Sequence, residues 1–299
     1  MELNGFKGII PAVTIAYDKQ GRVSPRRLEQ LYEFLIQGGV DGLFVGGSTG
    51  EWPLLTVEER KLATQVALDT AKGRVPVLMH IGSMFVDQVV DYAVWAKQAG
   101  VAAVSIVMPY YFTYDEEGLA RYFDAILPKI ELPVILYNIP GNVKNPLTVS
   151  LYKRLTQDYP VVAGVKDSSM DFLHIQEYKY AIPELTYFTG NDAQILPCLM
   201  WGGNGAISAT AGVFPEVVTR MNNLYQTGDF EGAKEIQNKI MEYRSFVVSH
   251  PALSVVKAAL ELRGFATGGL RMPLHDLSET HRVLLKELLE RLEFPLGSI

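Results

Sequence analysis

The sequence predicts an α/β protein, a (β/α)8 TIM barrel followed by a C-terminal helical extension of about three helices. Three observations predict it: eight short apolar runs, amphipathic stretches between them, and helical periodicity without a convincing strand after residue 227. The runs are continuous and rich in Val and Ile, which is typical of parallel strands buried on both faces. Eight β-then-α units favour a closed barrel, because a doubly wound open sheet, the alternative, usually has fewer strands.

The expected strands are bounded by turn and helix signals. They cover residues 8–15, 42–45, 75–81, 102–108, 133–137, 161–165, 185–189 and 205–208. Ser24 before a proline places a capping hydroxyl at the first helix. Thr56 and Glu59 match a capping box, and Gly100 follows the end of a periodic run. We therefore expect a barrel catalytic domain over residues 1–226 and a helical extension over residues 227–299.

Composition restricts the class of protein. The chain has 299 residues, 48% hydrophobic and 20% charged, which is enough for a large core. Its net charge of −6 argues against a nucleic-acid partner, and no basic cluster indicates a membrane surface. A single cysteine, Cys198, cannot form an internal disulfide, and we expect it in the core. No signal-peptide pattern or long apolar run occurs, so we expect a cytoplasmic protein.

The active site of such a barrel lies at the carboxyl ends of its strands. Lys166 directly follows the sixth run, where burial should lower its pKa and leave an amine able to form a Schiff base. The alternative is a structural ion pair with Asp167 or Asp192. The remaining lysines are expected on helix surfaces, or at the start of a strand in the case of Lys7. Tyr137, at the end of the neighbouring strand, favours the catalytic interpretation, because a phenol can carry protons beside an imine.

Other strand ends supply candidate binding residues. The glycine-rich turn at 46–50 carries two hydroxyls and suits a carboxylate, although an ordinary tight turn is the alternative. The five histidines show no metal-ligand spacing, and His80 is expected to be structural. We therefore expect no metal and no cofactor beyond a covalent Schiff base on Lys166.

Four motifs, in this order and spacing, resemble the dihydrodipicolinate synthase/N-acetylneuraminate lyase superfamily of pyruvate-dependent class I aldolases. They are GGSTGE at 46–51, YNIP at 137–140, GVKDSS at 164–169 and GNDA at 190–193, and the resemblance covers essentially the whole chain. It implies a homotetramer, a dimer of dimers, that acts on pyruvate or another 2-oxo acid. Such a protein would have no nucleic-acid or membrane partner.

The resemblance also implies residue roles. Lys166 would form the Schiff base, Tyr137 would be the acid/base, and Thr49 would sit in its proton relay. Tyr111 resembles a tyrosine that many members lend to a neighbouring subunit's site. The implied substrate-binding residues are Gly47, Ser48, Ser168, Gly190, Asp192 and Ile207.

Two positions at which this chain departs from the usual motifs of the superfamily indicate the branch to which it belongs. The synthase branch usually has an arginine two positions after YNVP, whereas this chain has Gly141 and Asn142. The sialic acid branch usually has an acidic pair where this chain has Asp192 and Ala193. The main hypothesis is therefore a lyase that cleaves a 2-keto-3-deoxy sugar acid reversibly into pyruvate and an aldehyde. A dihydrodipicolinate synthase, an N-acetylneuraminate lyase, a keto-deoxy sugar acid dehydratase and a non-catalytic oxo-acid-binding barrel are the alternatives.

Overall fold

The computed structural model describes residues 6–297. The start of the expected barrel domain, at residue 1, and the end of the expected extension, at residue 299, lie outside the described residues. The structure contains all eight expected strands, shortened or shifted by a few residues at their ends. They are β1 Gly8–Pro11, β2 Leu43–Val45, β3 Val77–His80, β4 Ala103–Val107, β5 Val134–Asn138, β6 Val162–Asp167, β7 Thr186–Thr189 and β8 Gly205–Ser208. They form one sheet in the order β1-β8-β7-β6-β5-β4-β3-β2, the order of a (β/α)8 barrel.

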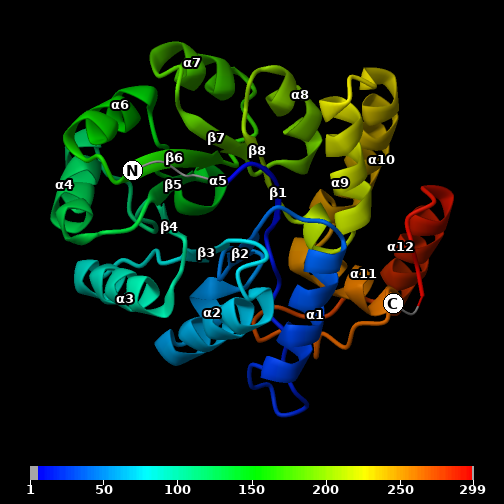
Figure 1. Cartoon of the computed structure of the whole chain (residues 1–299). Coiled ribbons are helices and arrows are strands. Elements are labelled where there is room, and N and C mark those ends of the chain that lie inside the picture. Colours follow the sequence, from blue (N-terminus) through cyan, green and yellow to red (C-terminus); the bar gives the residue numbers. More distant parts are fainter. Residues whose placement is uncertain (1–5, 298–299) are drawn as a thin grey trace. The chain divides into compact units, whose positions relative to one another are not determined.

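Helices follow the strands along the chain (Figure 1). They are α1 Pro25–Gln37, α2 Val57–Ala71, α3 Val86–Ala99, α4 Glu116–Ile126, α5 Pro140–Val143, α6 Val149–Asp158, α7 Leu173–Ala181, α8 Ile195–Met200, α9 Pro215–Gln226, α10 Phe230–Val248, α11 Ala252–Leu262 and α12 Glu279–Arg291. A short 3₁₀ turn, η1 Trp52–Leu54, precedes α2. Among residues 6–297, no helix is long and apolar enough to cross a membrane.

Local capping signals are mostly confirmed. Thr56 and Glu59 form both hydrogen bonds of a capping box at the start of α2. Gly100 ends α3 in the left-handed conformation that glycine tolerates. Ser24 is the N-cap of α1, but its hydroxyl makes no capping hydrogen bond, so that expectation is wrong. Pro25 starts α1 without one, because its fixed φ suits the first helical position.

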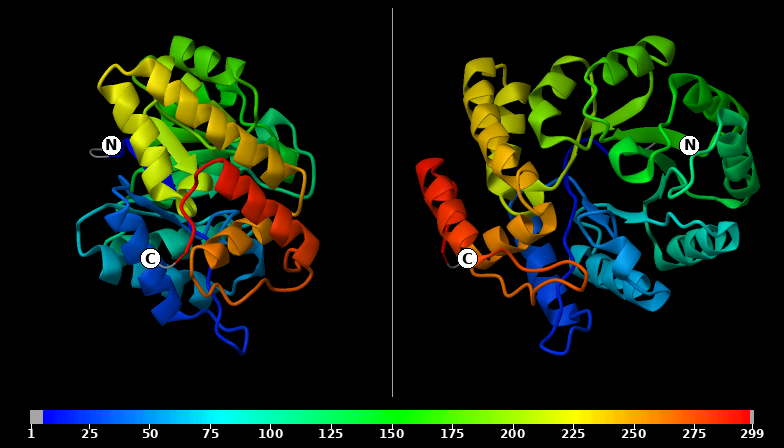
Figure 2. Two further views of the ribbon diagram at one scale, coloured as in Figure 1. Left: turned by 90° about the vertical axis from the view of Figure 1, so that its right-hand side faces the viewer. Right: turned by 180° about the vertical axis from the view of Figure 1, so that it is seen from behind.

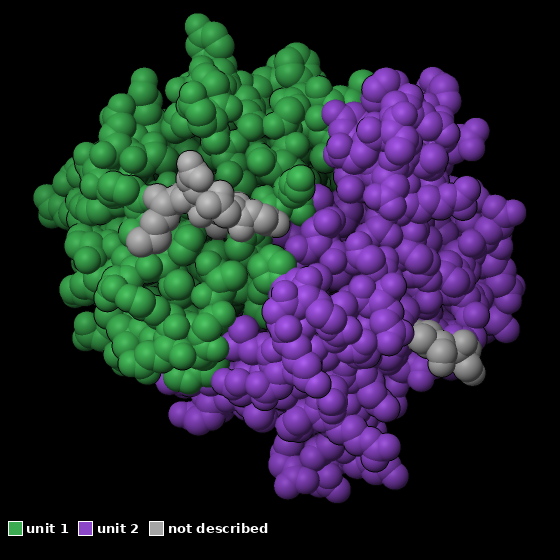
Figure 3. Space-filling model, in the orientation of Figure 1, with its two compact units in different colours: residues 1–7, 76–207 green, residues 8–75, 208–299 purple. Residues whose placement is uncertain are grey.

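The chain divides into two units, shown in separate colours in Figure 3. The first contains residues 76–207 with residues 6–7. In it β3 to β8 pair in parallel, and Tyr137 of β5 lies opposite Lys166 of β6. The helices α3, α4, α6 and α7 lie along the outside of these strands (Figure 1). Cys198 of α8 is buried in this unit as expected, and burial raises the pKa of its thiol to about 12.

The second unit contains residues 8–75 and 208–297. It holds β1, β2, α1, α2 and the helices from α9 onward, the last three of which are yellow, orange and red in Figure 2. The expected boundary between residues 226 and 227 stays a prediction.

Helix α11 overturns one expectation about lysines. Lys257 was expected on a helix surface, but it is 2% exposed, and every residue from Ser254 to Leu260 is buried. A helix that is apolar around its whole circumference has no solvent face to give to a cation. The sequence signal for the burial of Lys257 was a single cation within an otherwise apolar helical segment.

Candidate active site

Lys166 lies inside the carboxyl end of β6 rather than after it. It is 3% exposed, and its Nζ lies 4.0 Å from the centroid of the Tyr137 ring, a cation–π distance. Burial lowers the pKa of Lys166, opposed by interactions with Tyr137 and, more weakly, with Asp192. A lysine with a lowered pKa holds more of its amine in the neutral, nucleophilic form. The parallel register produces this pairing, because it places the two residues opposite each other.

Asp167, one of the two expected partners of Lys166, receives hydrogen bonds from other groups. The Asn138 side-chain amide donates to Oδ2 over 3.1 Å, and the Ser169 backbone N–H donates to Oδ1 over 2.7 Å. His174 Nδ1 lies 3.0 Å from Oδ2. The hydrogen bond to Asp167 is the largest cause of the raised pKa of His174. Asp167 therefore joins β5, β6 and α7 at the residue that follows Lys166.

Gly190 follows β7 where there is no room for a side chain. A Cβ there would lie 1.9 Å from Ser168 Oγ and 3.0 Å from Lys166 Cε. The Gly190 N–H also donates to the Asp167 carbonyl over 2.6 Å. Glycine therefore allows the end of β7 to approach Lys166 and Ser168 closely.

Two further expected binding residues belong to the same unit. Asp192 begins a short 3₁₀ turn and is 8% exposed, and its charge acts on Lys166. Ile207 is buried on β8 at 1% exposure. Strand ends of this unit thus bring together Lys166, Tyr137, Ser168, Gly190 and Asp192.

Tyr111 differs from the rest of the expected set. It is 74% exposed and has a left-handed φ of 76°, which is rare for a residue with a bulky side chain. Its ring packs edge-on against Phe112, with centroids 4.9 Å apart. The Asn145 side-chain amide holds this loop by donating to the Pro109 and Phe112 carbonyls over 2.8 Å each. An aromatic pair held in solvent on a fastened loop is available to another protein surface.

The glycine-rich turn belongs to the second unit and follows β2. Gly46 has a φ of 71°, and a Cβ on Gly47 would lie 2.3 Å from Phe44 Cε1. Ser48 and Thr49 are half-buried at the tip of the turn. The turn therefore requires its glycines sterically.

Three further residues of the first unit contact the expected site residues: His80, which was expected to be structural, and Asn138 and His174, to which no role was assigned from the sequence. His80 ends β3, is fully buried and packs edge-on against Tyr137 with ring centroids 6.0 Å apart. Asn138 and His174 contact Asp167, as described above. His80 and Asn138 are polar residues at strand ends, and that position was the available signal. No local sequence pattern indicated that His174, which lies on α7 after β6, would contact Asp167.

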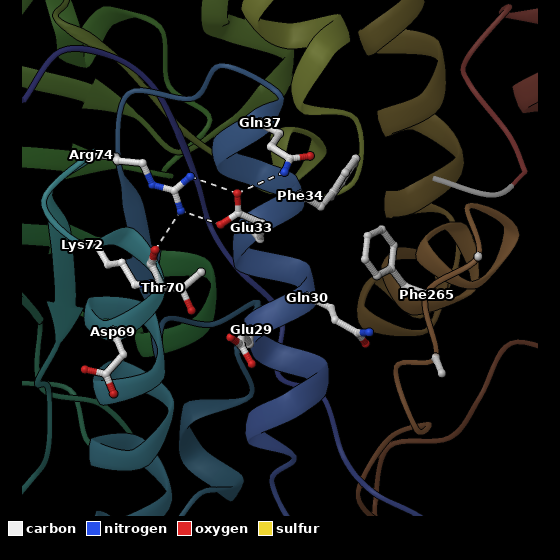
Figure 4. A pocket seen from close by; sticks show the side chains of 12 residues that line it. Glu29, Gln30, Glu33, Phe34, Gln37, Asp69, Thr70, Lys72, Arg74 and Phe265 are labelled. Atoms are coloured by element: carbon white, nitrogen blue, oxygen red, sulfur yellow. Dashed lines mark hydrogen bonds and ion pairs between the residues drawn. The ribbon is translucent and has the colours of Figure 1, made fainter.

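A cavity of about 630 Å³ in the second unit contains none of the expected site residues (Figure 4). Its walls come from α1, from the end of α2 and from the segment after α11. Arg74 donates to both carboxylate oxygens of Glu33 and to the Thr70 carbonyl. Gln37 also donates to Glu33. These charged groups satisfy one another, so the cavity gives no separate indication of a ligand.

Comparisons with known proteins identify relatives over nearly the whole chain. The sequence model of the Dihydrodipicolinate synthetase family matches residues 5–292. A 4-hydroxy-tetrahydrodipicolinate synthase of Methanocaldococcus jannaschii is 34% identical over 96% of this chain and 99% of its own. The structure of YagE, a prophage protein of Escherichia coli K12 belonging to the dihydrodipicolinic acid synthase family, in complex with pyruvate, superposes with a TM-score of 0.93. It is 31% identical and covers 97% of this chain and 99% of its own. A Ruminococcus gnavus sialic acid aldolase gives a TM-score of 0.90 at 31% identity, over 96% and 97% of the two chains.

Proposed function

Because this chain belongs to the dihydrodipicolinate synthetase family, whose members are carbon–carbon lyases that form a lysine Schiff base, we propose that Lys166 forms that Schiff base with pyruvate. The observation that carries the proposal is the burial of Lys166 on β6 with its Nζ over the Tyr137 ring. A buried amine with a lowered pKa attacks the ketone carbon, and water leaves as the imine forms.

In the cleavage direction, Lys166 forms the imine with the C2 ketone of the longer 2-oxo acid, and this imine withdraws electrons from the C3–C4 bond. Tyr137 takes the proton of the substrate hydroxyl at C4, and the C3–C4 bond breaks to release an aldehyde. The electron pair of that bond passes into the imine as an enamine. Protonation at C3 and addition of water then release pyruvate and free the lysine. We assign Gly47, Ser48 and Thr49 to the substrate carboxylate, because a glycine-rich turn offers N–H groups and hydroxyls to an anion.

We propose a 2-keto-3-deoxy sugar acid as the substrate cleaved, with Ser168 and Asp192 binding its hydroxyls. Helix α5 supports this choice, because it offers Gly141 and Asn142, both exposed, where an aldehyde carboxylate would need a cation. Condensation of pyruvate with aspartate semialdehyde is the second candidate, supported by the relatives named as synthases.

Reductive trapping tests the proposed chemistry. Incubation with pyruvate and borohydride should place a reduced adduct on Lys166, located by mass spectrometry, and the Lys166→Ala variant should show none. Absence of an adduct in the folded wild-type protein would contradict the aldolase mechanism and favour a barrel that only binds oxo acids.

A substrate panel then separates the branches. Pyruvate release from 2-keto-3-deoxy sugar acids should exceed release from N-acetylneuraminate. It should also exceed dehydration of the same acids and condensation with aspartate semialdehyde. Faster condensation than cleavage would overturn the sugar-acid assignment and leave the Schiff base in place.

The exposed pair at 111–112 supports a further proposal, that the protein is a homo-oligomer, a dimer of dimers, in which Tyr111 enters a neighbouring subunit's site. Light scattering should report a tetramer. The Tyr111→Ala variant should lose activity in proportion to loss of that contact, and a fully active monomer would contradict it.

A further inference from the structure

We propose that Lys257 is a positioning residue for the turn at residues 46–51, hereafter the Ser48 turn. The inference rests on the proposed function, in which Ser48 and Thr49 of this turn bind the substrate carboxylate. Lys257 comes from α11 and belongs, like the turn, to the second unit.

The Ser48 turn is closed by the backbone of Glu51. The Glu51 N–H donates to the Ser48 carbonyl over 3.1 Å. Glu51 has a φ of 56°, in the left-handed region that residues with a Cβ disfavour. A Cβ on Gly50 would approach the Val13 carbonyl to 3.1 Å, so the turn has little room to rearrange on that side. A displacement of Glu51 would therefore displace Ser48.

The Glu51 carboxylate is held by two side chains, and we call Glu51, Lys257 and Tyr17 the clamp. Lys257 Nζ lies 2.6 Å from Glu51 Oε1, and the Tyr17 hydroxyl donates to Oε2 over 3.2 Å. Lys257 Nζ also lies 4.4 Å from the Tyr17 ring centroid and donates to the Gly269 carbonyl. Glu51 and Lys257 are 1% and 2% exposed. Each side chain of the clamp thus contacts the other two.

A second cation fastens the other end of the same connection. Arg271 Nη1 donates to the Leu54 carbonyl over 2.9 Å and to Glu59 Oε2 over 2.7 Å. Glu59 is the residue that completes the capping box of α2. The segment from β2 to α2 is therefore held at one end by Lys257 and at the other by Arg271. Lys257 holds the end that carries Ser48.

A buried ion pair is a directional contact rather than a simple source of stability. Replacing a buried ion pair by apolar residues of similar volume often leaves the stability of a protein unchanged. A charge-assisted hydrogen bond, however, fixes both the distance and the angle of the carboxylate. Ser48 and Thr49 of the turn are assigned to the substrate carboxylate, so a displaced turn would weaken the contacts that hold the substrate. The clamp is therefore expected to affect substrate binding more than the chemistry at Lys166.

The test uses three clamp variants: Lys257→Met, Glu51→Gln and the variant that combines these two substitutions. They are compared with a control variant, Arg263→Met. Arg263 is a buried cation at the end of the same helix that pairs with Glu216 and donates to the Val213 carbonyl, so it is a matched control. The readout is the pyruvate concentration that gives half-maximal borohydride trapping. Trp52 emission, in a background with Trp95→Phe and Trp201→Phe, reports on the turn directly.

We expect each clamp variant to raise the half-saturating pyruvate concentration about tenfold and to shift Trp52 emission. The maximal trapping rate should change little. The double variant should bind no more weakly than either single variant, because both remove the same contact. Arg263→Met should leave pyruvate saturation near that of the wild type.

Two outcomes would overturn the positioning role. One is a half-saturating pyruvate concentration in the clamp variants that stays within twofold of the wild-type value. The other is an Arg263→Met variant whose half-saturating concentration rises as much as that of the clamp variants. If Lys257→Met does not fold, Glu51→Gln decides, because it keeps the shape of the side chain. A wild-type protein without an adduct would instead defeat the proposed function, and in that case the Trp52 emission of the variants still tests the clamp.

Discussion

Within residues 6–297, Lys166 and Lys257 are almost completely buried, one in each unit, and their surroundings differ. Lys166 faces the Tyr137 ring, and the charge of Asp192 acts on it. Lys257 contacts the Glu51 carboxylate at 2.6 Å, and Asp276 and Glu261 also act on it. Burial lowers the pKa of both. Burial alone therefore does not mark a catalytic lysine, and we use the chemistry of the nearest partner to separate the proposed nucleophile, Lys166, from the ion-paired Lys257.

The largest expected effect is the loss of activity in Lys166→Met. Without the amine no imine forms, and turnover should fall by roughly 10⁴-fold or more, as for other essential nucleophiles. The same variant should be more stable below pH 10.5 by about 1 kcal/mol, because it removes a buried cation whose pKa is lowered. Steady-state kinetics and urea unfolding check the two parts. A less stable variant would show that Lys166 is held as firmly as Lys257.

The identical substitution at the other lysine should have the opposite effect on stability. Lys257→Met leaves the Glu51 carboxylate buried without its cation, which should lower the free energy of unfolding by about 3–5 kcal/mol. Urea unfolding at neutral pH measures the loss. The double variant Glu51→Leu/Lys257→Met should recover most of it. A single variant as stable as the wild type would mean that water or another group replaces the cation.

A smaller effect is expected from Tyr137→Phe, which keeps the ring beside Lys166 and removes only the hydroxyl. The cleavage rate should fall about a hundredfold, within the range of a lost general acid/base. Reductive trapping on Lys166 should persist, because the amine remains. Loss of trapping together with turnover would instead assign the hydroxyl to imine formation.

The smallest expected effect concerns pH. Since burial lowers the pKa of Lys166, neutral amine appears at lower pH than in an exposed lysine. The rate of imine formation should therefore rise with pH and level off before pH 10.5, the ordinary value. Asp192→Asn removes a charge that raises this pKa, so the rise should move to lower pH. A shift to higher pH would mean that Asp192 acts on Lys166 in another way.

The strands and the placement of Lys166 beside Tyr137 could be predicted from the sequence, because both follow from local patterns. Buried parallel strands are continuous apolar runs, and neighbouring strands place their ends side by side. The partners of Asp167 could not be predicted, because His174 comes from a helix whose orientation no local pattern fixes. The burial of Lys257 does not follow from helical spacing, because spacing does not take account of how apolar the whole segment is.

The clamp can form only late in the synthesis of the chain, because its members lie far apart in the sequence. The ribosome makes Lys257 roughly 200 residues after Glu51, when β1 to β8 have already been made. Until then a nascent chain has Lys166, Tyr137 and the strands that hold them, but no cation for the Glu51 carboxylate. Chains that fold during synthesis do so from the amino terminus onward. The Ser48 turn would therefore be among the last parts of the protein to reach its final conformation. A chain ending before α11 would contain Lys166, the proposed Schiff-base residue, but would lack the ion pair that we propose fixes the Ser48 turn.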